Sequence, residues 1–174
     1  MKKVQYFIFI LLMSCSTSKV ITDYDENTNF SKYKTYTFFD DIGTGLNEFD
    51  VDRAADALFD EMELLGFKEV ETPDFYINFK AKTAAPKVTN TIAIGLGSGG
   101  RNGGFGVSGG IPIGGKKLDE EITVEFVDAK TNELFWEGIL TSTIKEKRKP
   151  EDRVAYFKEV VREILQKYPH NNDK

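Results

Sequence analysis

Few residues in this chain have side chains that could carry out catalysis or bind a metal. The 174 residues include one cysteine, Cys15, and one histidine, His170. Because His170 follows Pro169 in the C-terminal tail, nothing holds its imidazole against partners, and the chain offers no Ser-His-Asp or Cys-His arrangement. One Cys and one His also cannot form an internal disulfide or a structural zinc site of the Cys/His type.

Two pairs of carboxylates, Asp40-Asp41 and Glu120-Glu121, have the side chains that glycoside hydrolysis uses. Neighbouring residues on a strand point to opposite faces, however, and exposed acid pairs are usually solvated. We therefore expect no enzyme, and a carboxylate-dependent hydrolase is the least favoured alternative. No calcium loop of the Asp/Asn-rich type is present, and we expect no metal and no cofactor.

The middle of the chain is rich in glycine and formally matches two phosphate-binding motifs. Eleven of the 15 glycines lie between Gly95 and Gly115. The G-x-G-x-x-G matches are not followed by a helical pattern, which the mechanism requires. In the P-loop-like run that ends at Lys117, this lysine replaces the Ser or Thr that binds Mg²⁺, and Pro112 removes an amide donor. We expect no nucleotide, and a net charge of −5 without a basic tract argues against nucleic acid.

The strongest chemical signal is at the N-terminus. Lys2 and Lys3 precede an apolar run that ends at Met13, which fits the charged and apolar regions of a secretory signal. The run is shorter than the roughly 20 residues of a membrane-spanning helix. The following Leu12-Met13-Ser14-Cys15 resembles a bacterial lipobox, although Met13 departs from the usual small residue. The alternatives are a buried N-terminal helix or strand and a Cys15 that is an ordinary small hydrophobe.

The lipobox implies that a lipid is attached to the sulfur of Cys15 and that signal peptidase cleaves between Ser14 and Cys15. Each buried methylene contributes about 0.8 kcal/mol, so two or three acyl chains hold a protein stably at a membrane. Residues 1–14 then form the signal peptide, and residues 15–19 form the lipidated N-terminus and a short tether. Because position 16 is not Asp and no acidic cluster follows, we expect an outer-membrane lipoprotein on the periplasmic face.

Two segments have the apolar spacing of amphipathic helices. The first covers 50–65, where Asn47 or Asp50 can cap the start and Gly66 stands at the left-handed position after the end. The second runs from Pro150 to about Tyr168. The apolar stripes are, in the first helix, Val51, Ala54, Ala55, Leu58, Met62 and Leu65, and in the second, Val154, Phe157, Val161, Ile164 and Tyr168.

The remaining apolar segments have the alternation or the β-rich composition of strands. In one of them Leu134, Trp136, Leu140 and Ile144 share a side; Trp136 is expected in the core, with stacking on a sugar as the alternative. The expected strands are 20–24, 33–39, 74–82, 87–96, 105–113, 120–128 and 134–144.

We therefore expect an α+β fold. A mainly antiparallel sheet of about six to seven strands has two helices packed on one face, since most strand connections are short. Residues 20–169 form a single domain, which contains a Gly-rich hairpin at 95–115, and residues 170–174 form a disordered tail.

The Gly-rich hairpin is a long ribbon with few side chains to pack. One interpretation is that it is flexible, another that it packs against something large, and a third that it pairs edge-on with a strand of a partner. The side chains that would contact such a partner are Ile92, Ile94, Leu96, Arg101, Phe105 and Val107.

The order of short motifs resembles that of a family of bacterial lipoproteins, the domain-of-unknown-function family 4136. The resemblance covers nearly the whole mature chain, and Glu137 is a minor departure where a basic or polar residue is usual. It implies a lipoprotein with an α+β fold and carries over no activity and no catalytic residues. The matching segments are 20–25, 30–36, 65–67, 73–75, the Gly-rich middle, 126–128, 134–138 and the helix end at 168–169.

Together these observations predict a lipid-anchored protein of the bacterial cell envelope that binds a protein or an envelope component without catalysis. The alternative is a periplasmic carrier with a lipid or glycan pocket between the sheet and the helices.

Overall fold

A computed structural model describes residues 18–85 and 117–169. The expected strands at 87–96 and 105–113, the ribbon side chains, the cleavage site and the C-terminal tail lie outside the described residues. The elements in chain order are β1 (Lys19–Tyr24), the 3₁₀ helix η2 (Phe30–Lys32), β2 (Thr35–Phe38), α1 (Glu48–Leu64), β3 (Lys68–Glu69), β4 (Phe75–Ala84), β5 (Lys117–Asp128), β6 (Leu134–Lys145) and α2 (Pro150–Leu165).

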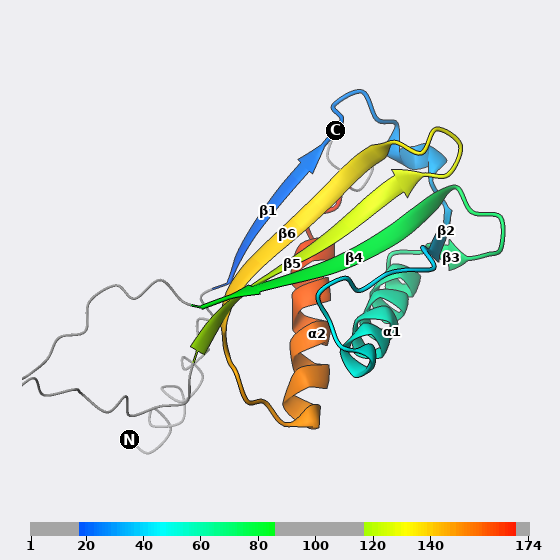
Figure 1. Cartoon of the computed structure of the whole chain (residues 1–174). Helices are drawn as coiled ribbons and strands as arrows, with labels where there is room; N and C mark the ends of the chain where they lie inside the picture. The colour runs from blue at the N-terminus through cyan, green and yellow to red at the C-terminus, as the bar shows by residue number, and fades with distance from the viewer. Residues whose placement is uncertain (1–17, 86–116, 170–174) are drawn as a thin grey trace, which may run out of the picture.

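The strands form one six-stranded sheet in the order β1-β6-β5-β4-β2-β3. The long strands β4, β5 and β6 are antiparallel neighbours, and β1 pairs antiparallel with β6 at one edge. Both helices lie against one face of this sheet (Figure 1). The expected α+β class, with two helices on one face, is therefore confirmed.

The sheet is mixed rather than purely antiparallel. β2 pairs in parallel with β4 and also with the two-residue strand β3. Parallel neighbours need a long crossover connection, and α1 lies within the connection from β2 to β4. The strand expected over 33–39 is shorter, because Tyr33 ends the 3₁₀ helix η2 instead of opening β2.

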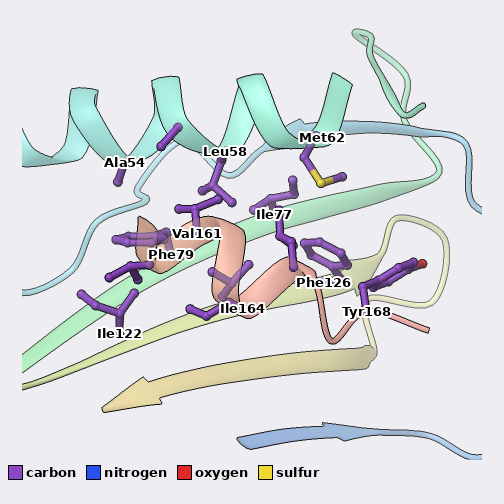
Figure 2. Packing of buried hydrophobic residues seen from close by; sticks show 14 of the residues in the cluster. Ala54, Leu58, Met62, Ile77, Phe79, Ile122, Phe126, Val161, Ile164 and Tyr168 are labelled. Carbon is purple, nitrogen blue, oxygen red and sulfur yellow. The ribbon is translucent and has the colours of Figure 1, made fainter. Parts of the chain in front are cut away.

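The core lies between the sheet and the two helices. Alternate residues of the long strands are fully buried, which confirms the predicted alternation, and Trp136 is 0% exposed. Figure 2 shows Leu58 and Met62 of α1 and Val161 of α2 directed toward the strands. The buried strand side chains include Phe75, Ile77, Phe79, Ile122, Val124, Phe126, Trp136 and Leu140.

The ends of α1 follow the expected signals. The Asn47 side chain accepts a hydrogen bond from the backbone N–H of Asp50, which identifies Asn47 as the N-cap. Gly66 has a φ of +84°, in the left-handed region that glycine adopts at low cost. The helix itself is Glu48–Leu64, two residues longer at its start than the expected range.

Asp50 has a second role that its position in the sequence does not reveal. Its carboxylate is 0% exposed and accepts hydrogen bonds from Arg53 (2.7 Å) and from Nε of Arg153 (2.8 Å) on α2, with a further contact to Arg153 Nη2. Two ion pairs, Lys158 with Asp60 and Arg162 with Glu61, continue the same contact between α1 and α2. The two helices are thus joined by these ion pairs as well as by apolar packing.

Two side chains do not lie where the sequence pattern places them. Leu134 is 48% exposed, because a bulge opposite Phe126 and Val127 inserts Phe135 into the core in its place. Val154 is 41% exposed on α2, where the buried stripe begins at Phe157. α2 ends at Leu165, and Tyr168 is buried from the turn that follows the helix.

Candidate functional site

An open groove of about 640 Å³ lies at the edge of the sheet formed by β3. We call it the acidic groove. Its volume is within the range of small-molecule and peptide sites, roughly 300–1,000 Å³. The residues that line it are Tyr36, Thr37, Phe59, Glu63, Gly66, Phe67, Lys68, Glu69, Val70 and Glu71.

The turn after α1 builds one wall of the groove. The left-handed Gly66 reverses the chain, and the N–H of Phe67 donates to the carbonyl of Met62 (3.0 Å). The chain then pairs with β2 as β3, through the N–H of Lys68 (3.1 Å to Lys34 O) and of Val70 (3.0 Å to Tyr36 O). Because alternate residues of a strand direct their backbone groups to opposite sides, the N–H and carbonyl of Glu69 face outward from the sheet.

Three carboxylates surround the acidic groove without a cationic partner. Glu63 on α1, Glu69 on β3 and Glu71 in the following loop are exposed, and none of them has a hydrogen bond or ion pair with any residue in the described ranges. By contrast, their helical neighbours Asp60 and Glu61 are both paired with cations of α2. The groove therefore has an excess of negative charge that the fold itself does not neutralise.

Tyr36 forms the buried floor of the acidic groove. It is 1% exposed, and its hydroxyl makes no hydrogen bond within residues 18–85 and 117–169. Burial raises the pKa of Tyr36 above its usual value, and the nearby carboxylates of Glu69 and Glu63 raise it further. The phenol is consequently neutral at pH 7 and can both donate and accept one hydrogen bond.

The remaining walls are apolar and partly open to solvent. Phe59 of α1 is 43% exposed and Val70 is 36% exposed. Phe67 is half-buried and packs edge-on against Phe75, with ring centroids 5.6 Å apart, and against Tyr168 at 5.7 Å. The groove thus combines a fixed aromatic floor with exposed apolar side chains and free carboxylates.

The point where the chain enters the domain is diagonally opposite the acidic groove. Ser18 donates a hydrogen bond from Oγ to Glu163 of α2 (2.6 Å), and Lys19 then pairs with Thr141 in β6. β1 is one edge of the sheet and β3 the other, five strand spacings or about 24 Å apart. Along β4, the registers at Lys82 and Phe75 are separated by about 23 Å.

The two carboxylate pairs lie in different surroundings. Asp40 and Asp41 are both exposed in the loop before α1. Glu121 is exposed, but Glu120 is 5% exposed on the opposite face of β5, which corrects the expectation of a solvated pair. Glu120 is 3.5 Å from the guanidinium of Arg148. Because Glu120 and Arg148 are 28 positions apart in the sequence, no local pattern indicates this buried pair.

An open hollow of about 400 Å³ adjoins α2 and β6 beside Ile144 and Arg148, and a much smaller cavity lies between the same two elements. That cavity, beside Ser142 and Tyr156, has a volume of about 30 Å³. This is enough for about one water molecule. A cavity of this size is too small for a lipid or a glycan.

Among the described residues, no three His, Cys, Asp or Glu side chains are placed to hold a metal ion. No helix in the same ranges is long and apolar enough to cross a membrane. The sequence pattern did not single out the groove residues, since Leu65-Gly66-Phe67 indicated only a helix end. The only sequence feature that marks the groove is the presence of Glu63, Glu69 and Glu71 close to this helix end. Their spacing does not indicate a binding site.

Comparisons with solved structures give the fold and no activity. A PDZ domain protein from Parabacteroides distasonis matches over 90% of this chain and 38% of its own, with a TM-score of 0.55 and 13% identity. The chain therefore spans less than half of that protein. The PelC dodecamer from Paraburkholderia phytofirmans is 10% identical, with a TM-score of 0.46 over 85% of this chain and 94% of its own.

No curated protein sequence matches the chain. The sequence profile of one family matches residues 20–170, which is nearly the whole of the described domain together with the Gly-rich segment. The motifs that resembled this family in the sequence are therefore part of a match that spans the chain. The chain belongs to the family described as a domain of unknown function, DUF4136.

Proposed function

We propose that this protein is a lipid-anchored, non-catalytic binding protein of the bacterial cell envelope, which recognises a protein or envelope component through the acidic groove. The observation that carries the proposal is the groove itself. Three carboxylates without partners and an exposed Phe59 surround a buried phenol, at the corner of the sheet diagonally opposite the chain entry.

The lipid anchor rests on the sequence Leu12-Met13-Ser14-Cys15 after the charged and apolar leader. Three peptide steps separate Cys15 from Ser18, which is a span of about 10 Å at most. Ser18 is held to α2 through Glu163, so the β1 corner would stay close to the membrane surface. The acidic groove, roughly 33 Å away across the sheet, would then be free to meet a partner in the periplasm.

Absence of catalysis is part of the same proposal. The acid pairs that could have served a hydrolase are an exposed loop pair and a strand pair divided between two faces. Recognition by a groove at a sheet edge needs neither a nucleophile nor a metal, and sheet edges commonly bind extended segments.

Two measurements test the proposal. For the anchor, mass spectrometry of the protein from its host membranes should show acylated Cys15 as the first residue, and Cys15→Ser should move the protein to the soluble fraction. An unmodified sulfur with residues 1–14 intact would contradict the anchor.

For the groove, a photoreactive benzoylphenylalanine at Phe59 should capture a partner in intact cells. The matched control is the same group at Val154, whose exposure of 41% is close to the 43% of Phe59 but which lies on the other helix. Equal capture from both positions, or none from Phe59, would contradict recognition through the groove.

A further inference from the structure

We infer that the acidic groove binds an extended segment of a partner protein and takes a lysine side chain of that segment between Glu63 and Glu69. The inference rests on the proposed function and specifies the class of ligand. It is drawn from the charges, the unused hydrogen-bonding groups and the backbone at the sheet edge.

The charge of the groove favours a cation. Glu63, Glu69 and Glu71 line it, and Lys68 is the only cationic residue among its lining residues. Lys68 pairs with Thr35, whereas Glu69 pairs with Tyr36, so in this parallel register Lys68 and Glu69 point to opposite faces of the sheet. Glu69 therefore lies on the same face as the Tyr36 ring, and Lys68 does not neutralise it there.

The unused hydrogen-bonding groups match an ammonium group. A lysine ammonium has three N–H donors and no acceptor. The carboxylates of Glu63 and Glu69 can accept two of these hydrogen bonds, and the hydroxyl oxygen of Tyr36, which has no partner among the described residues, can accept the third. The Tyr36 side chain lines the open groove, so its hydroxyl oxygen is within reach of a donor that enters there.

The walls of the groove suit the aliphatic part of lysine. Phe59 of α1 is 43% exposed and lines the same groove as the carboxylates. Lysine buries its methylene chain along apolar surface while its charged end stays at polar groups. An apolar neighbour in the partner segment would cover the rest of this surface.

The backbone at the edge favours an extended segment over an isolated amine. The N–H groups of Lys68 and Val70 are used by β2, which leaves the N–H and carbonyl of Glu69 directed outward. A strand added at this edge can pair with both groups and place alternate side chains toward the groove.

The test uses the full-length chain in detergent and the fluorescent peptide acetyl-Val-Leu-Lys-Val-Leu-amide, with fluorescence anisotropy as the measurement. A second peptide replaces the lysine by norleucine, which keeps the aliphatic chain and removes the charge. We expect the lysine peptide to bind at least tenfold more tightly, and Glu63→Gln/Glu69→Gln to weaken its binding by about tenfold, as for two partly exposed ion pairs.

The matched control is Glu26→Gln/Glu133→Gln, which removes two exposed carboxylates elsewhere and should change the affinity less than twofold. Equal binding of the two peptides, no binding of either, or equal effects of the two double variants would overturn the inference. If photocapture at Phe59 still succeeds in those cases, the proposed function stands and only the ligand class is wrong. Capture of a second copy of this chain would also overturn the inference.

Discussion

The contact between α1 and α2 makes a sharp prediction at Asp50. This carboxylate is 0% exposed and accepts hydrogen bonds from Arg53 and Arg153, while the Asn47 amide donates to it from 2.7 Å. Asp50→Asn keeps the shape of the side chain and removes the charge. The two guanidinium groups then lose the anion that holds them.

The magnitude follows from the burial of each group. Breaking a fully buried ion pair by removing one partner costs about 3–5 kcal/mol. The side chains of Arg53 and Arg153 are 22% and 25% exposed, so water compensates part of the loss. We expect the free energy of unfolding to fall by about 2–4 kcal/mol. For a chain of this length that corresponds to a decrease in Tm of roughly 4–16 °C.

Urea unfolding followed by the fluorescence of Trp136 measures this change, because Trp136 is the only tryptophan and is fully buried. A double-mutant cycle with Arg153→Gln isolates the contact between the helices. We expect the double variant to be less destabilised than the sum of the two single variants. A decrease below about 0.5 kcal/mol for Asp50→Asn, the range of ordinary surface substitutions, would refute the reasoning.

Two glycines and one buried acid give the remaining stability predictions. A Cβ at Gly138 would lie 2.5 Å from Ile164 Cγ2 and 2.8 Å from the Trp136 ring, so Gly138→Ala should cost at least about 1–3 kcal/mol in urea unfolding, by overpacking. Gly66→Ala meets no atom within 4 Å but adopts a φ of +84°, so it should lower the free energy of unfolding by about 1–2 kcal/mol through the backbone conformation alone. Extra space around the new methyl group should therefore restore stability at position 138 and not at position 66, and recovery at both positions would contradict these two causes. The Lys32 ammonium (2.9 Å), followed by backbone N–H groups and the Tyr33 hydroxyl, holds the pKa of Asp128 below its usual value. The ionised Asp128 therefore stabilises the fold fully above about pH 4, and this contribution is lost as the pH falls further. The free energy of unfolding of Asp128→Asn, measured by a chevron or urea series from about pH 7 to 2, should lack this part of the acid dependence.

Much of the fold is visible in the sequence because its signals are local. The alternation from Phe75 to Ala81 and from Ile122 to Phe126 depends only on which face of a strand is buried. The glycine at 66 indicates a helix end because few other residues adopt a positive φ there. These features need no knowledge of distant parts of the chain.

The features that the sequence did not reveal are all non-local. The bulge that turns Phe135 inward and Leu134 outward is a property of the pairing between β5 and β6. The parallel pairing of β2 with β4 depends on where α1 packs, and the pairing of Asp50 with Arg153 joins residues 103 positions apart. The acidic groove is of the same kind, since it exists only because β3 lies beside β2 and α1.

The acidic groove also has an energetic consequence that separates a binding role from a structural one. Three carboxylates without cationic partners repel one another, and Glu63 and Glu69 also flank the buried phenol of Tyr36. If these acids served the fold, their replacement would destabilise it. We expect instead that Glu63→Gln/Glu69→Gln raises the free energy of unfolding by about 0.3–1 kcal/mol, because like-charge repulsion at a partly exposed surface has this size. The control Glu26→Gln/Glu133→Gln should change it less. If Glu63→Gln/Glu69→Gln weakens peptide binding and stabilises the fold, the charge of the groove serves a partner and not the fold. A loss of stability in this variant would contradict that conclusion.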